Sequence, residues 1–89
     1  MTAQETHEHR LKRLRMRSMR RGIKEMDIIL GRFADLSLDD LDPGMLDLYD
    51  GLLSENDQDL YQWVTEQVAA PEMYRDLIAQ IARVATPAK

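Results

Sequence analysis

The stretch RRGIKEMD at residues 20–27 joins a strongly basic segment to an apolar one. Residues 9–21 are rich in Leu, Met, Arg and Lys, all of which favour a helix. From Ile23, inside this stretch, to Phe33, apolar residues recur at helical spacing, which predicts a second, amphipathic helix. Gly22 lies between the two segments and can adopt the left-handed conformation that ends many helices. The stretch therefore predicts a corner between two helices, with Gly22 as the helix terminator.

Three more helices are expected further along the chain. Asp42 stands before Pro43, an order typical of a helix start, and this helix should run to about residue 53. Asn56 or Asp57 can cap a fourth helix that extends to about residue 69, and a fifth should cover residues 71–84. Each of these segments carries apolar residues on one face, so all of them are expected to pack on a common core.

The remaining segments are predicted to connect or flank the helices. Residues 34–41 are acidic and are interpreted as connecting chain. Residues 1–8 are expected to form a disordered lead-in, residues 9–85 a single helical domain, and residues 86–89 a tail. The alternation typical of strands is absent from the sequence. We therefore predict an all-α fold, a compact bundle of about five short helices.

The composition argues for a binding protein and against an enzyme. A chain of 89 residues has one modest core and little room for a deep substrate cavity. It contains no cysteine, which excludes thiolate catalysis and cysteine-based metal sites. Both histidines, His7 and His9, lie in the N-terminal segment, away from any side chain that could act as a nucleophile with them. The sequence thus predicts neither an active site nor a metal site.

Charge is distributed unevenly along the chain. Residues 1–32 contain nine Lys or Arg and four Asp or Glu, whereas residues 33–89 contain three and twelve, for a net charge of −4. The basic run has no interleaved aromatic residue, so nucleic-acid binding is not expected. No apolar run is long enough to cross a membrane, and residues 1–9 lack the features of a signal or transit peptide. These features predict a cytoplasmic protein of the bacterial type without membrane insertion.

The corner at Gly22 is the candidate functional surface. Gly22 has no side chain to hold a partner away, and Arg21 offers a planar fork of donors. Glu25 could reach back to free backbone N–H groups or, across the corner, to Arg21. Each residue also has a simpler interpretation. Gly22 could serve only as a helix cap, Glu25 as a first-turn acid and Arg21 as a solvated charge. The residues alone leave both interpretations open.

Two blocks of sequence resemble the family of SdhE and succinate dehydrogenase assembly factor 2. The first contains Arg21, Gly22 and Glu25, with Arg20 and Asp27 as neighbours. The second runs from the Leu pair at residues 52–53 to DQDLYQWV at residues 57–64. The resemblance covers residues 10–84, nearly the whole chain. It departs from the family pattern at residues 56–58, where the expected acidic and proline-containing start of the fourth helix is replaced, and at residues 42–44.

The resemblance implies a small helical factor that helps to attach FAD covalently to a respiratory flavoprotein. Its client would be the flavoprotein subunit of succinate dehydrogenase, with fumarate reductase as a second candidate client. The implied partner-binding residues are Arg20, Arg21, Gly22, Glu25 and Asp27. FAD would be the cofactor of the client, with none bound stably by this chain, which is expected to be monomeric. The alternative is a small regulatory binding module, similar to an antitoxin and unrelated to flavin attachment.

Overall fold

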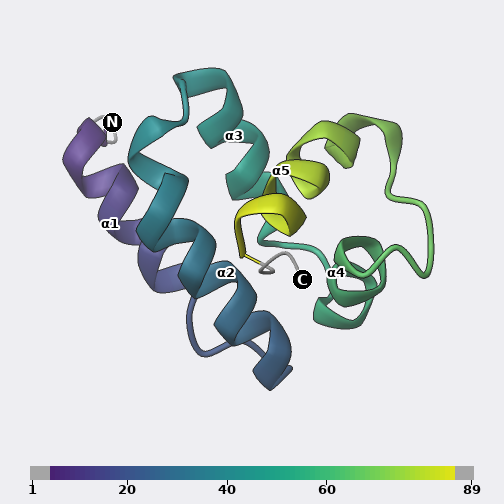
Figure 1. Cartoon of the computed structure of the whole chain (residues 1–89). Coiled ribbons are helices and arrows are strands. Elements are labelled where there is room, and N and C mark those ends of the chain that lie inside the picture. Colours follow the sequence, from purple (N-terminus) through teal and green to yellow (C-terminus); the bar gives the residue numbers. More distant parts are fainter. Residues whose placement is uncertain (1–4, 86–89) are drawn as a thin grey trace.

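The structure is a computed structural model that describes residues 5–85. Within this range the chain forms helices joined by turns and contains no strand, which confirms the predicted all-α fold (Figure 1). The elements, with η for a short 3-10 helix, are α1 (His7–Arg17), α2 (Lys24–Ser37), η1 (Leu38–Asp40), α3 (Pro43–Leu52), α4 (Asp57–Val64), η2 (Glu72–Tyr74) and α5 (Arg75–Ala85). Helix α1 begins two residues before the expected start of the helical domain, whereas residues 1–4 and the predicted tail lie outside the described range. No helix in the described part of the chain is long and apolar enough to cross a membrane.

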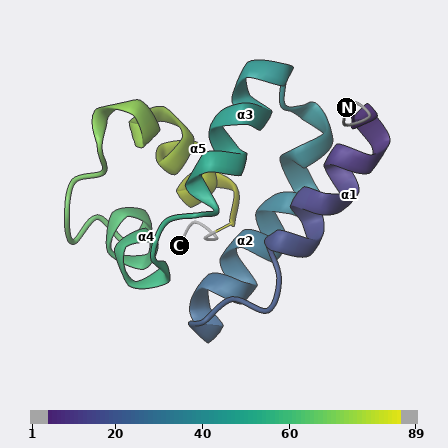
Figure 2. The ribbon, with the colours of Figure 1, turned by 180° about the vertical axis from the view of Figure 1, so that it is seen from behind.

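Helix α2 is the central element of the bundle. It contacts α1, α4 and α5. Helices α1 and α2 lie side by side and run in opposite directions, and the views from the front and from behind agree on this (Figures 1 and 2). The α1–α2 corner therefore lies at one end of this pair, where α2 begins and comes close to α4.

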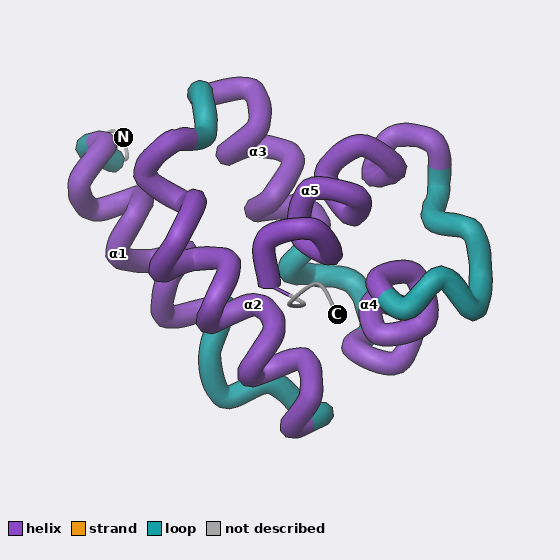
Figure 3. The backbone as a smooth tube through the Cα atoms, viewed as in Figure 1, coloured by secondary structure: helices purple, strands orange, loops and turns teal. Residues whose placement is uncertain are grey.

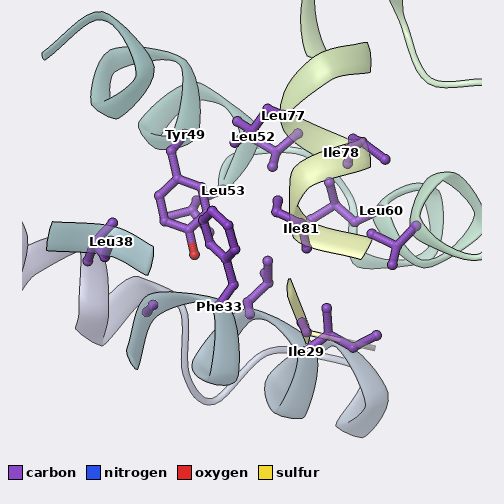
Figure 4. Close-up of a cluster of buried hydrophobic side chains, with 14 of the residues drawn as sticks. Ile29, Phe33, Leu38, Tyr49, Leu52, Leu53, Leu60, Leu77, Ile78 and Ile81 are labelled. Carbon is purple, nitrogen blue, oxygen red and sulfur yellow. The ribbon is translucent and has the colours of Figure 1, made fainter. Parts of the chain in front are cut away.

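The core is a continuous set of apolar side chains drawn from every α-helix and from η1 and η2. Among them, the rings of Phe33 and Tyr49 lie next to each other, tilted by 45° with their centroids 5.4 Å apart (Figure 4). The hydroxyl of Tyr49 is also buried, and it forms a 2.6 Å hydrogen bond with the hydroxyl of Ser18, which is fully buried at the end of α1. This pairing satisfies two polar groups that would otherwise be costly to bury.

Two predicted helix starts are confirmed by side-chain caps. The Asp42 carboxylate accepts a hydrogen bond of 2.8 Å from the backbone N–H of Met45, and Pro43 occupies the first turn of α3. The Asn56 side chain accepts one of 2.8 Å from the backbone N–H of Gln58 at the start of α4. Both caps are made within a few residues, so local sequence was sufficient to predict them.

The prediction of connecting chain at residues 34–41 is wrong. Helix α2 continues to Ser37, and η1 follows it directly. Leu38 and Leu41 are buried in the core, with 0% and 6% of their surface exposed. Because these leucines gain from burial while Asp35, Asp39 and Asp40 stay exposed, the acidic segment becomes part of the folded bundle.

The fourth and fifth helices are shorter than predicted. Helix α4 ends at Val64, where Glu66 adopts a left-handed φ of 65° and the backbone N–H of Gln67 donates to the Gln62 carbonyl at 2.8 Å. The chain then continues as a loop to η2, and α5 starts only at Arg75 (Figure 3). This loop carries the chain from the end of α4 to the start of α5, so that the apolar face of α5 can pack on α2.

Candidate partner-binding site

The α1–α2 corner turns at Arg20 and not at Gly22. Arg20 adopts a left-handed φ of 56°, whereas no glycine in the described residues has a positive φ. The backbone N–H of Arg20 donates a 2.7 Å hydrogen bond to the carboxylate of Asp27 in the first turn of α2. A left-handed residue other than glycine costs about 1–3 kcal/mol, and this hydrogen bond helps to offset that cost. The prediction that Gly22 is the left-handed helix terminator is therefore wrong.

The corner is fixed to α4 by the carboxylate of Asp57. One oxygen, Oδ1, accepts hydrogen bonds from Nε and Nη2 of Arg21 at 2.9 and 2.7 Å. The other, Oδ2, accepts a 2.5 Å hydrogen bond from the backbone N–H of Gly22. The side chains of Arg21 and Asp57 are only 11% and 15% exposed. We call this arrangement of Arg21, Gly22 and Asp57 the Asp57 junction.

Glycine at position 22 allows the close approach of Asp57 without adjustment. A Cβ atom at this position would lie 3.1 Å from the Asp57 Oδ2 atom, closer than ordinary van der Waals contact. Gly22 is itself exposed. Its backbone is therefore accessible to a partner and is also in close contact with Asp57.

Arg21 faces the interior of the corner and has a structural role. Besides the two hydrogen bonds to Asp57, its guanidinium donates to the carbonyl of Arg17 at 2.8 Å and to the carbonyl of Leu53 at 3.0 Å. Its donors are thus used to join the end of α1 to the segment between α3 and α4. The structure places Arg21 in the predicted corner, but its guanidinium is occupied by partners within the chain.

Glu25 makes no contact with Arg21. Its side chain is exposed on the first turn of α2, and its carboxylate forms no hydrogen bond or ion pair with any residue in the range 5–85. The expectation that Glu25 reaches back across the corner is wrong, because Asp57 pairs with Arg21 and Asp27 accepts the backbone N–H of Arg20. Glu25 is consequently available to a partner.

Asp57 is the residue of the corner that sequence reasoning missed. It was considered only as a possible cap of the fourth helix, whereas Asn56 provides that cap. Asp57 lies 36 residues from Arg21 in sequence, so no local pattern links the two. The available signal was its position in the second block of residues that resembles the family, in a turn where an acid is also favoured by the helix dipole.

The uneven charge along the sequence is largely neutralised inside the molecule. Arg13 and Arg17 on α1 both donate to the carboxylate of Asp50 on α3. The hydrogen bond from Arg13, together with the nearby positive charges, lowers the pKa of Asp50 below its usual value. Two further ion pairs join α1 to the acidic half, Arg10 with Asp47 and Arg15 with Asp39. Much of the basic run is therefore bound to acidic residues within the chain.

A hollow of about 350 Å³ lies between the start of α2 and the face of α4, next to the Asp57 junction. We call it the α2–α4 hollow. It is lined by Ile23, Glu25, Gln58, Tyr61, Gln62 and Gln67. No group of three His, Asp or Glu side chains within residues 5–85 is arranged to hold a metal ion.

Residues 12–85 match the model of a family described as the flavinator of succinate dehydrogenase. The chain belongs to this family. The match covers the bundle from α1 to α5 and includes both the corner and Asp57. The family resemblance drawn from the two sequence blocks is thereby confirmed.

Members of the flavinator family with high similarity to this chain come from fungi and an insect. The chain is 43% identical over 75 residues to succinate dehydrogenase assembly factor 2 of Meyerozyma guilliermondii, covering 81% of this chain and 56% of that protein. The factor of Schizosaccharomyces pombe is 38% identical over 71 residues, covering 80% and 51%. Assembly factor 2-A of Drosophila persimilis is 36% identical over 78 residues, covering 85% and 49%. The chain thus spans about half the length of these curated relatives.

The names of these flavinator relatives correct one prediction. All three are named as mitochondrial proteins. This contradicts the cytoplasmic location of the bacterial type that was predicted from the N-terminal sequence.

Proposed function

We propose that this protein is an assembly factor that binds the flavoprotein subunit of succinate dehydrogenase and promotes the covalent attachment of FAD to it. The observation that carries the proposal is the match of residues 12–85 to the flavinator family. The factor would itself be non-catalytic and monomeric, and FAD would be a cofactor of the client and not of this chain. Fumarate reductase, the second candidate client, gains no support from the comparisons.

The corner would be the docking surface, with its residues in two different roles. The backbone of Gly22 and the side chains of Arg20 and Glu25 are exposed and would contact the client. Arg21 and Asp27 would hold the corner in shape through their hydrogen bonds to Asp57 and to the backbone of Arg20. A surface that is already fixed in the free protein loses little conformational freedom on binding, which favours affinity.

Promotion of FAD attachment follows from differential binding. A factor shifts its client only by binding one of the client's conformations more tightly than the others. The groups that react with FAD would belong to the client, and the factor would favour the arrangement in which they can react. It should therefore bind the flavoprotein with non-covalent FAD more tightly than the flavoprotein with covalent FAD. Equal affinity for the two forms would rule out this mechanism.

The proposal is tested by measuring covalent flavin on the flavoprotein subunit. The subunit from cells with and without this protein is denatured, separated on a gel and examined for flavin fluorescence. We expect the fluorescence to be lost without the protein and restored by the wild type. Unchanged fluorescence would refute the proposal and favour a regulatory, antitoxin-like binding module.

The surface is tested in the same assay with charge reversals. Glu25→Lys should restore little fluorescence, because it places a cation where the client is expected to bind. Glu8→Lys is the matched control, since Glu8 is also an exposed acid in the first turn of a helix but lies at the far end of α1 from the corner. If both variants restore fluorescence equally, the corner is not the docking surface.

A further inference from the structure

The lining of the α2–α4 hollow is mostly polar. Four of its six lining side chains are polar, namely Glu25, Gln58, Gln62 and Gln67, and no cationic side chain is among the six. Its volume of about 350 Å³ is at the low end of the range for small-molecule sites, so it suits a single long side chain better than a dinucleotide. The carboxylate of Glu25 would also repel the pyrophosphate of FAD.

The walls of the hollow are fixed by interactions within the chain. The Asp57 junction holds the start of α2 against the start of α4 and so sets the distance between Ile23 and Glu25 on one side and Gln58 on the other. On the opposite wall, the Gln67 backbone N–H is bound to the Gln62 carbonyl at 2.8 Å. The backbone on both sides of the hollow is therefore held in place by interactions within the chain.

The chemistry of the lining selects a cation with several donors. Glu25 supplies an unpaired negative charge, and the side-chain amide of Gln67 is oriented by a 2.9 Å hydrogen bond from its Nε2 to the Thr65 hydroxyl, which leaves its oxygen free to accept. The carboxamides of Gln58 and Gln62 provide further acceptors. Tyr61 adds an aromatic ring, on which a planar cation can stack. A guanidinium, with five donors in one plane, meets these features more fully than the compact ammonium of lysine.

We propose that the α2–α4 hollow receives an arginine side chain of the flavoprotein client, with Glu25 as its ionic partner and Gln58, Tyr61, Gln62 and Gln67 as its surroundings. This inference rests on the proposed function and identifies the group that the docking surface recognises. It assigns to α4 a direct part in client binding, in addition to its part in holding the corner.

The first test compares the affinities of variants for the purified flavoprotein subunit carrying non-covalent FAD, measured by isothermal titration calorimetry. Glu25→Gln should bind about 10- to 100-fold more weakly than the wild type, the loss expected for a hydrogen-bonded ionic contact. Glu8→Gln, which removes the same charge from the first turn of another helix, should bind like the wild type. Equal affinity of the two variants would overturn the inference. Failure of the wild type to bind at all would overturn the proposed function as well.

The second test identifies the client's side chain. The flavoprotein subunit is treated with an arginine-specific dicarbonyl reagent in one sample and has its lysines acetylated in another. With arginines modified, the affinity ratio of wild type to Glu25→Gln should fall towards one, because the partner of Glu25 is gone. With lysines acetylated, the ratio should persist. A ratio that survives arginine modification, or that disappears only on lysine acetylation, would overturn the assignment of arginine.

Discussion

Replacing Asp57 by asparagine should destabilise the protein strongly although the two side chains have nearly the same shape. The Asp57 carboxylate accepts three hydrogen bonds, two from Arg21 and one from the backbone N–H of Gly22. An asparagine has a single acceptor oxygen, so it can serve Arg21 or Gly22 but not both. Its NH₂ group would then face another donor, and the guanidinium of Arg21, only 11% exposed, would lose its counter-charge.

The size of the effect follows from these losses. Hydrogen bonds to charged groups contribute about 1.5–3 kcal/mol each, and breaking a largely buried ion pair costs about 3–5 kcal/mol. Because Asp57→Asn keeps either the two hydrogen bonds from Arg21 or the one from Gly22, we expect a loss of about 3 kcal/mol in the free energy of unfolding. In a domain of this size, that corresponds to a decrease in Tm of roughly 12–24 °C.

The measurement is urea and thermal unfolding followed by circular dichroism. Asp59→Asn is the matched control, because Asp59 is an exposed acid in the same first turn of α4 and its replacement changes the net charge equally. This control should lose only the helix-dipole contribution of about 0.3–1 kcal/mol. If the two variants unfold at the same urea concentration with the same m-value, the Asp57 junction does not stabilise the fold and the reasoning fails.

Three other predictions concern stability. The hydrogen bond from Arg13 lowers the pKa of Asp50, so the stabilisation by Asp50 is present above about pH 4 and is lost as the pH falls through the folded-state pKa. The difference in the free energy of unfolding between wild type and Asp50→Asn, measured by urea unfolding, should therefore shrink as the pH is lowered. Ser18→Ala should lower the free energy of unfolding by about 1–3 kcal/mol, because it leaves the buried hydroxyl of Tyr49 unpaired. Adding Tyr49→Phe should recover part of this loss, and strict additivity of the two changes in the free energy of unfolding would contradict a direct interaction. Gly31→Ala should raise the free energy of unfolding by about 0.5–1 kcal/mol, because alanine favours a helix and an added Cβ at this position in α2 would have no atom within 4 Å. A lower Tm of the variant would show that the helix does not tolerate the methyl group.

The charge pattern illustrates how a correct observation about sequence can have a different meaning in the fold. The sequence separates a basic first third from an acidic remainder. In the structure, Arg13 and Arg17 of α1 pair with Asp50 of α3. Helix packing therefore decides which charged side chains remain available to a partner. Glu25 is available because it belongs to none of these ion pairs.

Local sequence by itself determined the helical class and the starts of α3 and α4. The spacing of apolar residues predicted the bundle, and Asp42 with Pro43 and Asn56 marked two starts, because a cap is made between residues only two or three positions apart. The same residues also carried the family resemblance. The segment that contains the corner was predicted from contiguous residues, although the chain turns at Arg20 and not at the expected Gly22.

Only the tertiary structure decided where the helices end and what the corner residues do. Leu38 and Leu41 extend the folded segment because a core is present to bury them. The backbone N–H of Gly22 donates to the carboxylate of Asp57, 35 residues away, and Arg21 turns inward to meet the same carboxylate. Such pairings depend on how helices distant in sequence pack together, and no local spacing encodes that information.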